Sequence, residues 1–452
     1  MGAASHPGGG RARANPGCES PFSPSVRHDQ HHLRGKDRPM LTCRLCGGSD
    51  LRSVLDLGAT PPCESFLTAE QLDEPETTYP LHLRICASCL LLQIPALITP
   101  EDTFTDYAYH SSYSESWVRH ARTYVDDATA RVGLGPDSFV VEVASNDGYL
   151  LRHVVDDSVR CLGIEPSVNV SEEARKVGVP TLTEFLSEDV ARSVRAEHGP
   201  ADLVAANNVY AHIPDLNGFT RALRGLVADD GWVSIEVHHA LHLVGDAQFD
   251  TIYHEHFQYY TVLTAQRALA AGGLRVVDVE LLETHGGSIR VWARPEELDA
   301  PVAPAVAEVI ATEAAAGLDT VEGHLGLAQR VSTIRNDLVS FLVQCARDGV
   351  RVAGYGAPGK GNTLLNYCGI RGDLLPWTVD RNPYKHGRFT PGTRVPVRAP
   401  EAIEEERPEV IVVLPWNLKA ELDAQLAHTA EWGARLVYPL PVLDVSPAGG
   451  AS

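Results

Sequence analysis

Four consecutive residues, Tyr253-His254-Glu255-His256, carry the groups best suited to acid–base chemistry in this sequence. The run places a phenol, two imidazoles and a carboxylate side by side among apolar and aromatic neighbours. Groups that exchange protons near neutral pH are costly to gather in apolar surroundings, so such a cluster predicts a site of proton transfer. A surface loop with ordinary histidines, or a partly buried polar network, is the alternative that these residues leave open.

Two C-x-x-C pairs, Cys43/Cys46 and Cys86/Cys89, offer four thiolates, which is the ligand set of a structural zinc ion. The 39 residues between the pairs exceed the spacing of an ordinary zinc ribbon, which predicts an insertion, and Cys63 lies within it. Four thiolates fill the tetrahedral shell, so the zinc is expected to be structural and not catalytic. Two unrelated thiol pairs are the alternative. Paired thiols without any sign of secretion also predict a reducing, cytoplasmic location.

A glycine-rich turn at 356–362 carries Lys360, and a helix is expected to start at Thr363. Backbone N–H groups and a lysine at the start of a helix make a binding site for an anion. The chain has only five lysines, so a lysine in this turn is informative. The spacing of a nucleotide-binding P-loop is missing. A solvated lysine on a loop is the alternative.

These groups need a scaffold, and the pattern of apolar residues predicts a doubly wound α/β sheet. Short apolar runs predict its strands, and the turn 144–148 joins the first strand to a helix opened by 149–151. Helical spacing follows over about 302–348, and a second, smaller α/β domain begins near Val350. The expected strands are 139–143, 160–164, 203–206 and 232–237 in the first sheet, and 351–355, 378–379 and 410–414 in the second.

The turn 144–148 lies where such sheets bind ligands, at the carboxyl end of a strand. Glu165 ends the next strand, where an acidic side chain accepts hydrogen bonds from ribose hydroxyls. The turn holds one glycine and the pair Asn146-Asp147, and it lacks the G-x-G-x-x-G pattern that lets a pyrophosphate approach. A nucleoside without phosphates, such as S-adenosylmethionine, is therefore favoured over a dinucleotide. A turn that binds no ligand is the alternative.

The bulk composition narrows the class of protein. A chain of 452 residues is too long for one core, so two or three domains are expected. The net charge of −21 argues against binding nucleic acid, which requires a basic face. No apolar run is long enough to span a membrane. Residues 1–39 lack the apolar segment of a signal peptide and are expected to be disordered, and Met40 is a candidate for the true start.

Taken in order, these motifs resemble the sugar C-methyltransferases of bacterial deoxysugar pathways, over nearly the whole chain after Met40. The resemblance implies a zinc-binding domain, a Rossmann-like methyltransferase domain and a smaller C-terminal α/β domain that binds the nucleotide sugar. The expected boundaries are 1–39 for the extension, 40–105, 106–300 and 301–446 for the three parts, and 447–452 for a disordered tail. The segments that carry the resemblance are the two cysteine pairs, 142–151, 249–257, 285–288 and 354–363.

The resemblance implies a reaction in which a base removes the C3 proton beside the C4 ketone of a dTDP-linked deoxyhexose. The enolate then takes the methyl group of S-adenosylmethionine, in antibiotic deoxysugar biosynthesis. His256 resembles the base of the family. The implied residues are His256, Tyr253, Glu255, His212 and Tyr107 for catalysis; Glu142, Ala144, Asn146, Gly148, Glu165 and Asn207 for the cofactor; Lys360, Gly359, Asn362, Gly287 and Ser288 for the substrate; and Cys43, Cys46, Cys86 and Cys89 for zinc.

Two other functions are consistent with the same segments. A nucleotide-sugar oxidoreductase using NAD(P) would share the α/β architecture, but the first turn is poor for a dinucleotide. A zinc protein that only binds nucleotide sugars would not need the acid–base cluster. The sequence leaves open which deoxysugar is used, whether C3 or C5 is methylated, whether C3 carries an amino or a hydroxyl group, and whether the enzyme is a monomer or a small homo-oligomer.

Two further expectations concern histidines. His254 is expected to be structural, because neighbouring residues in an extended segment point to opposite faces. The pair His238-His239 stands where the family is expected to be more apolar or aromatic. This departure bears on substrate detail and not on the class of reaction.

Overall fold

Three sheets organise the residues that the computed structural model describes, 41–99 and 111–449. Tyr107 lies outside these residues, as does the extension 1–39. The largest sheet has seven strands in the order β10-β11-β8-β7-β4-β5-β6. Its strands are β4 (Phe139–Val143), β5 (Arg160–Ile164), β6 (Thr181–Leu182), β7 (Ala201–Asn207), β8 (Val227–His238), β10 (Leu274–Leu282) and β11 (Ser288–Pro295).

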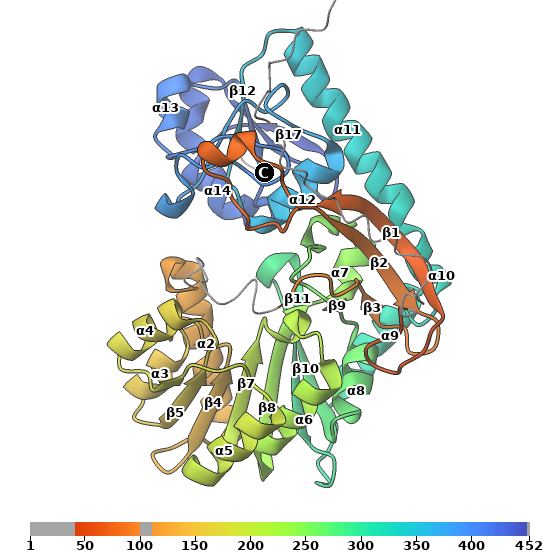
Figure 1. Ribbon diagram of the computed structural model, residues 1–452, viewed down its shortest axis with the longest axis vertical. Helices are drawn as coiled ribbons and strands as arrows, with labels where there is room; N and C mark the ends of the chain where they lie inside the picture. The colour runs from red at the N-terminus through yellow and green to blue at the C-terminus, as the bar shows by residue number, and fades with distance from the viewer. Residues whose placement is uncertain (1–40, 100–110, 450–452) are drawn as a thin grey trace, which may run out of the picture. The chain divides into compact units, whose positions relative to one another are not determined.

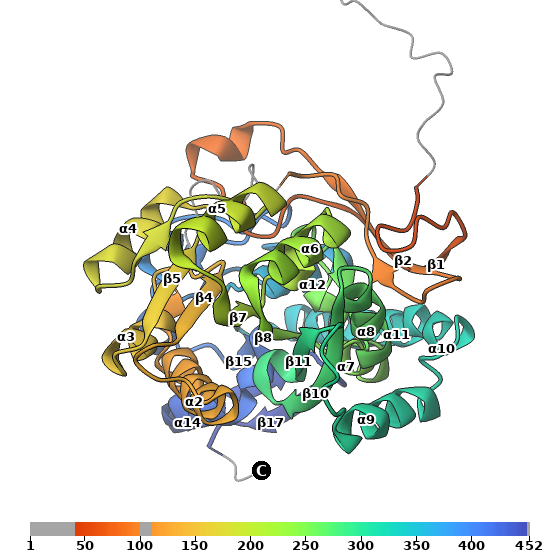
Figure 2. The ribbon, with the colours of Figure 1, turned by 90° about the horizontal axis from the view of Figure 1, so that it is seen from below.

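Five of these strands, β4 to β8, run parallel, whereas β11 pairs antiparallel with β8 and β10 antiparallel with β11. Helices cover both faces, with α2 and α3 on one side and α5 and α6 on the other (Figure 2). The helices are α2 (Glu115–Val132), α3 (Leu151–Asp156), α4 (Val168–Lys176), α5 (Glu188–His198), α6 (Leu216–Leu226), α7 (Ala240–Gly245) and α8 (Val262–Ala270).

The alternation of side chains along β4 explains the two layers of core. Val140 packs with the helices on the α2 face, whereas Val141 and Val143 pack with α5, α6 and α8. Because both faces are covered, the central strands are mostly apolar, as in a buried parallel sheet, and Glu142 in β4 is a buried exception. The first turn of α2 is capped by Ser114, whose side chain accepts a hydrogen bond from the backbone of Trp117, and the helix ends at Gly133 with φ of 76°.

A second, antiparallel sheet belongs to the cysteine-rich segment and has the order β1-β2-β3-β9. Its strands are β1 (Leu51–Thr60), β2 (Tyr79–Cys86), β3 (Leu92–Gln93) and β9 (Gln258–Tyr259). β9 comes directly after the acid–base cluster, so a strand from the middle of the chain completes the sheet of the zinc-binding segment (Figure 1). The register pairs Leu92 with Tyr259 and Gln93 with Gln258.

The C-terminal sheet has six strands in the order β14-β13-β12-β15-β16-β17, all parallel except β17. β17 ends at Pro447, the first residue of the expected tail. The elements of this part and of the linker before it are α9 (Pro304–Ala315), α10 (Glu322–Leu325), α11 (Leu327–Arg347), β12 (Val352–Tyr355), α12 (Gly359–Cys368), β13 (Thr378–Val379), β14 (Val397–Arg398), α13 (Ala402–Glu406), β15 (Val410–Val413), α14 (Lys419–Gln425), β16 (Arg435–Tyr438) and β17 (Asp444–Pro447).

One boundary near Lys360 was predicted wrongly. Helix α12 begins at Gly359 and not at Thr363, because Pro358 serves as its N-cap. Gly361 faces β15, and a Cβ there would lie 3.1 Å from the side chain of Leu414. The glycines that suggested an extended turn therefore permit close packing of the first helical turn.

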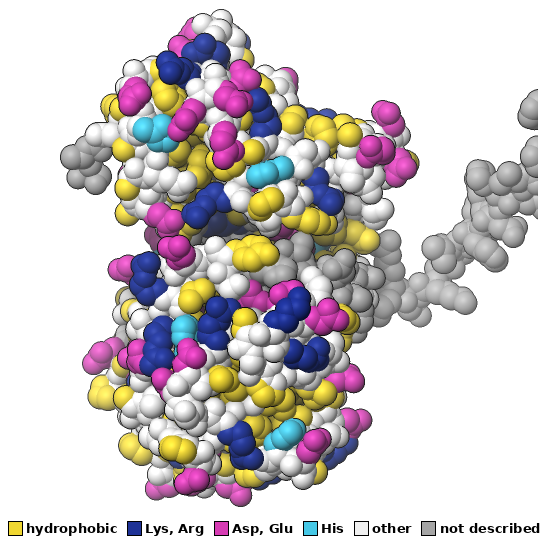
Figure 3. All heavy atoms as spheres, turned by 90° about the vertical axis from the view of Figure 1, so that its left-hand side faces the viewer, with side chains coloured by type: hydrophobic (Ala, Val, Ile, Leu, Met, Phe, Trp, Pro, Cys, Tyr) yellow, Lys and Arg dark blue, Asp and Glu magenta, His cyan; other side chains and the backbone are white. Residues whose placement is uncertain are grey.

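The surface shows charges of both signs. On the face in Figure 3, Lys and Arg side chains are interspersed with Asp and Glu. Among the described residues, none of the helices is both long and apolar enough to cross a membrane.

Candidate functional site

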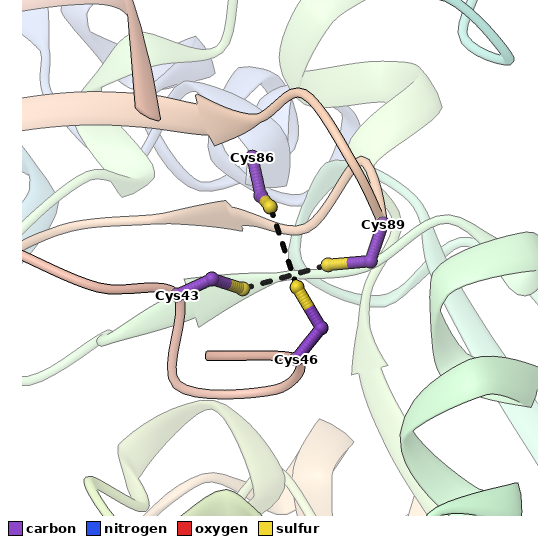
Figure 4. Close-up of side chains that lie close together, drawn as sticks. All are labelled: Cys43, Cys46, Cys86 and Cys89. Atoms are coloured by element: carbon purple, nitrogen blue, oxygen red, sulfur yellow. Dashed lines mark hydrogen bonds between the residues drawn. The ribbon is translucent and has the colours of Figure 1, made fainter. Parts of the chain in front are cut away.

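The four cysteines of the two C-x-x-C pairs converge as the sequence predicted (Figure 4). Their sulfur atoms all lie within 4.8 Å of one another. Cys43 Sγ is 3.4 Å from Cys89 Sγ, and Cys46 Sγ is 3.6 Å from Cys86 Sγ. Thiolates held about 2.3 Å from one zinc ion are roughly 3.8 Å apart, so the four donors fit a tetrahedral zinc site.

The turn after β4 has a strained backbone. Ala144 and Asn146 have φ of 57° and 50°, and Gly148 has φ of 76°. Non-glycine residues rarely adopt positive φ, and they do so where the surroundings impose it. The backbone N–H of Asn146 donates to Glu165 Oε2 (2.9 Å), and that of Ser167 donates to Oε1 (2.9 Å). Glu165 therefore holds the turn against the end of β5.

Several buried polar atoms around this turn have no hydrogen-bond partner among the described residues. They are Glu142 Oε2, Ser145 Oγ, Asp147 Oδ1 and Asn207 Oδ1. Burial raises the pKa of Glu142 well above its usual value, and the charges of Glu165 and Asp147 act in the same direction. Orphaned acceptors that face one turn fit a polar nucleoside, which would supply their missing partners. Of the predicted cofactor residues, Glu142, Ala144, Asn146, Gly148 and Glu165 thus lie at or beside the turn, and Asn207 ends the adjacent strand β7.

The acid–base cluster forms a β-turn and not an extended segment. The backbone N–H of His256 donates to the carbonyl of Tyr253 (3.0 Å). This closure brings their side chains together, with the Tyr253 hydroxyl 2.7 Å from His256 Nε2. His256 Nδ1 lies 3.1 Å from the carbonyl oxygen of Thr251. A carbonyl only accepts, so Nδ1 carries the proton, and Nε2 accepts from Tyr253.

His212 and His256 come together from different parts of the chain. Their ring centroids are 4.6 Å apart in an edge-on arrangement. Burial lowers the pKa of His212 to about 4 and that of His256 well below its usual value, and each cation would also repel the other. Both imidazoles are therefore neutral at physiological pH, the state in which a histidine can accept a proton.

The remaining two residues of the cluster contact other segments of the chain. His254 Nε2 lies 3.1 Å from the carbonyl of Tyr79 in β2, so it joins the turn to the zinc-binding segment. The Cys63 thiol donates to Glu255 Oε2 (3.4 Å). Burial raises the pKa of Glu255 to about 7. Cys63, which the sequence placed in the insertion between the knuckles, is thus a direct neighbour of the cluster.

Lys360 leaves the first turn of α12 toward residues of the catalytic stretch. Its Nζ lies 4.5 Å from the ring centroid of Trp416 and donates to Asn417 Oδ1. Trp416 Nε1 in turn donates to Asp250 Oδ2 (2.6 Å). Burial raises the pKa of Asp250 to about 6 and lowers that of Lys360 to about 8, and the opposite charge of each group opposes these shifts. Asp250 is fully buried, and Trp416 links it to Lys360, a connection that the sequence did not reveal.

The other predicted substrate residues have structural contacts. Asn362 Nδ2 donates to the carbonyl of Cys63 (2.7 Å), and a Cβ on Gly359 would lie 2.8 Å from Cys63 Sγ. Gly287 has φ of 121°, and a Cβ there would overlap the ring of His242. Ser288 Oγ donates to the carbonyl of Thr284 (3.0 Å). These residues pack α12 against Cys63, and they pack the loop before β11 against His242.

The two unexpected histidines are each accounted for. His239 Nε2 lies 2.8 Å from Glu313 Oε1, and Glu313 also accepts from the backbone N–H of Val262 at the start of α8. His238 Nε2 lies 2.8 Å from Gln248 Oε1. Burial lowers the pKa of His238 to about 3, and the charge of Lys360 acts in the same direction. His239 therefore anchors α9, whereas His238 is held by Gln248.

Sequence analysis also missed a buried ionic network beside the sheet. Glu236 in β8 accepts from Arg290 (3.0 Å) and lies 2.9 Å from His120 Nε2 in α2. Burial alone would raise the pKa of Glu236, but the hydrogen bond and charge of His120, together with Arg290, lower it to about 2. No spacing rule joins a helix residue to a strand more than 100 residues later, so only the structure reveals this pairing.

Comparison with known proteins agrees with this assembly. Family models match three consecutive parts: a zinc binding domain at residues 43–104, a methyltransferase domain at 117–279, and the C-methyltransferase C-terminal domain at 283–441. C-methyltransferase NovU of Streptomyces niveus is 34% identical over 404 residues, which are 89% of this chain and 96% of that protein. The chain belongs to the C-methyltransferase family.

The family membership confirms an enzyme that uses S-adenosylmethionine and carries a zinc-binding domain, in the α/β fold expected from the sequence. Solved structures that resemble part of the chain include magnesium protoporphyrin IX methyltransferase of Synechocystis PCC 6803 (16% identity, 40% of this chain and 81% of that chain, TM-score 0.30). Another is an S-adenosylmethionine-dependent methyltransferase of Anabaena variabilis ATCC 29413 (13% identity, 43% of this chain and 88% of that chain, TM-score 0.33).

Proposed function

We propose that this C-methyltransferase methylates C3 of a dTDP-linked 4-keto-deoxyhexose, through an enolate, in the biosynthesis of an antibiotic deoxysugar. The observation that carries the proposal is the paired geometry of His256. Its Nδ1–H is fixed on the Thr251 carbonyl, and its Nε2 lone pair meets the Tyr253 hydroxyl. A base with a fixed tautomer and a neighbouring hydroxyl is the minimum needed to remove a proton beside a ketone.

In the proposed reaction, His256 Nε2 takes the proton of C3, and the electron pair of the broken C–H bond moves to the ketone oxygen. The Tyr253 hydroxyl gives up its hydrogen bond to Nε2 and donates to that oxygen. Glu255, whose pKa is near neutrality, is protonated in part of the population and supplies a second donor. S-adenosylmethionine, when bound, supplies the electrophilic methyl group that the C3 carbanion requires.

The nucleotide sugar is proposed to bind with its diphosphate at the start of α12. Lys360, Gly359 and the helix N-terminus offer a cation and backbone N–H groups. Lys360 lies against Trp416, which donates to Asp250, and this link supports a substrate that reaches from the C-terminal domain to His256. Cytoplasmic location follows from the need for this activated sugar and for free thiols at the zinc site.

The test is exchange of substrate protons with deuterated water, followed by NMR on a dTDP-4-keto-6-deoxyhexose with S-adenosylhomocysteine present. Wild-type enzyme should exchange the C3 proton, and His256→Asn should lower both exchange and methylation by ~10²–10⁴-fold. His254→Gln is the matched control, because His254 contacts β2 and not the base, and it should retain exchange. Exchange of the C5 proton in place of the C3 proton would show that C5, and not C3, is the methylated carbon. Normal exchange in His256→Asn would refute the assigned base and make His212 the next candidate, together with Tyr107.

A further inference from the structure

Arg44, the residue after the first zinc-ligating cysteine, reaches the segment that follows the catalytic turn. Its guanidinium donates to the carbonyl of Phe257, to Gln258 Oε1 (3.0 Å) and to the carbonyl of Ile94 (2.9 Å). The guanidinium carbon also lies 5.4 Å from the centroid of the Phe257 ring. Phe257 is the immediate neighbour of His256, so one side chain joins the zinc knuckle to the proposed base.

The same contacts extend to the second histidine. Gln258 Nε2 donates to the carbonyls of Tyr210 (2.7 Å) and Ile213 (3.0 Å), which flank His212. The backbone N–H of Phe257 donates to the carbonyl of Ala211 (2.8 Å). The strand pairing of β3 with β9 holds this segment from the other side. Arg44 thus touches the two residues that fix the spacing of His212 and His256.

We propose that Arg44 is a positioning residue, which transmits the geometry of the zinc knuckle to the His256–His212 pair. The inference rests on the proposed function only in naming His256 as the base. The zinc ion, by fixing the loop between Cys43 and Cys46, fixes the origin of the Arg44 side chain. The planar guanidinium carries five N–H donors in a fixed geometry, so it can bond all three acceptors at once. The ammonium of lysine is a single point from which the three acceptors cannot all be reached.

The proposal predicts a loss of rate without a loss of ligand. Arg44→Met should lower kcat by ~10²-fold, since a misplacement of about 1 Å at a reacting group has that effect. The zinc content and the affinity for S-adenosylhomocysteine should stay within about twofold of wild type. Arg44→Lys, which keeps the charge and disturbs folding less, should recover only part of the rate.

Arg267→Met is the matched control. Arg267 donates to the carbonyl of Cys89 (2.8 Å), so it also joins α8 to a zinc knuckle, and among the described residues this is its one side-chain hydrogen bond. We expect the control to keep wild-type kcat. If Arg267→Met and Arg44→Lys lose rate equally, general anchoring of the zinc domain explains the effect, and the proposal is overturned.

A readout that needs no substrate separates this inference from the proposed function. In protein labelled with ¹⁵N-histidine, the signals of His256 are assigned by their loss in His256→Asn. Arg44→Lys should shift these signals, because the hydrogen bonds of Nδ1 and Nε2 change, and Arg267→Met should leave them in place. Unshifted signals in Arg44→Lys would overturn the positioning role. Shifted signals in an enzyme that fails to exchange any sugar proton would keep the positioning role and refute the proposed reaction.

Discussion

Replacing Glu255 by glutamine should stabilise the protein, by an amount that grows with pH. Burial raises the pKa of Glu255 from 4.5 to about 7. The side chain is 6% exposed, so solvent does little to screen the effect. A carboxyl whose pKa is raised on folding favours the folded state at low pH, and this contribution is lost as the pH rises from 4.5 through about 7. Raising the pKa of Glu255 from 4.5 to about 7 corresponds to about 3 kcal/mol in the free energy of unfolding, at 1.36 kcal/mol per pKa unit.

Urea unfolding between pH 5 and 8.5 measures this difference. The free energy of unfolding of Glu255→Gln should exceed that of wild type by about 1 kcal/mol at pH 5 and by about 3 kcal/mol at pH 8.5. Glu236→Gln is a control of opposite sign, because the pKa of Glu236 is lowered to about 2. Its stabilising contribution is lost only as the pH falls from 4.5 through 2, so the variant should be about 3 kcal/mol less stable throughout the same range.

A stability difference between Glu255→Gln and wild type that stays constant across the range would refute the reasoning. It would mean that Glu255 titrates at its ordinary pKa and that the pocket beside Cys63 is accessible to water. The carboxyl ¹³C signal of Glu255, assigned by its loss in the glutamine variant, provides an independent titration. A midpoint near 4.5 in that experiment would contradict the burial of the group.

Three further predictions follow from the binding sites. Cys43→Ser should lower the zinc content below about half an equivalent per chain by elemental analysis, and a full equivalent would contradict the four-thiolate site. Glu165→Ala should weaken binding of S-adenosylhomocysteine by about 1–3 kcal/mol in calorimetry, and unchanged affinity would show that the cofactor lies elsewhere. Lys360→Ala should raise KM for the sugar nucleotide with little change in cofactor affinity, whereas Lys419→Ala, which alters a lysine paired with Asp423 and Asp444, should change neither. If Lys360→Ala instead loses cofactor binding and keeps sugar-nucleotide binding, the C-terminal domain binds the cofactor, and the assigned roles of the two domains are wrong.

Sequence analysis succeeded where a local pattern determines the structure. The strands 139–143, 160–164 and 378–379 were predicted with the bounds that the structure gives them. Short, mostly apolar runs bounded by turn residues have few other uses in an α/β chain. The four-cysteine cluster was predicted for a similar reason, since a C-x-x-C pair brings two thiolates together by its own backbone geometry.

The conformation of residues 253–256 was predicted wrongly. The prediction that His254 is structural assumed that this segment is extended, with neighbouring residues on opposite faces. A strand would place Tyr253 and His256 on opposite faces. The turn instead joins their side chains, and the strand begins only at Gln258. The residue types were therefore informative about chemistry, while the hydrogen bond that orients the base depended on a turn that no glycine or proline marks.

The other features that could not be predicted from the sequence are contacts between segments far apart in the chain. β3 and β9 are two residues long each, too short for any periodicity to reveal, yet their pairing joins the zinc-binding segment to the catalytic turn. Arg44 and Cys63 extend the same junction, one beside His256 and the other on Glu255. Because a loop of more than 160 residues closes between β3 and β9, the entropy of closure opposes their pairing. Packing of the whole zinc segment must supply the opposing free energy, which gives the four-cysteine site a structural role at this junction.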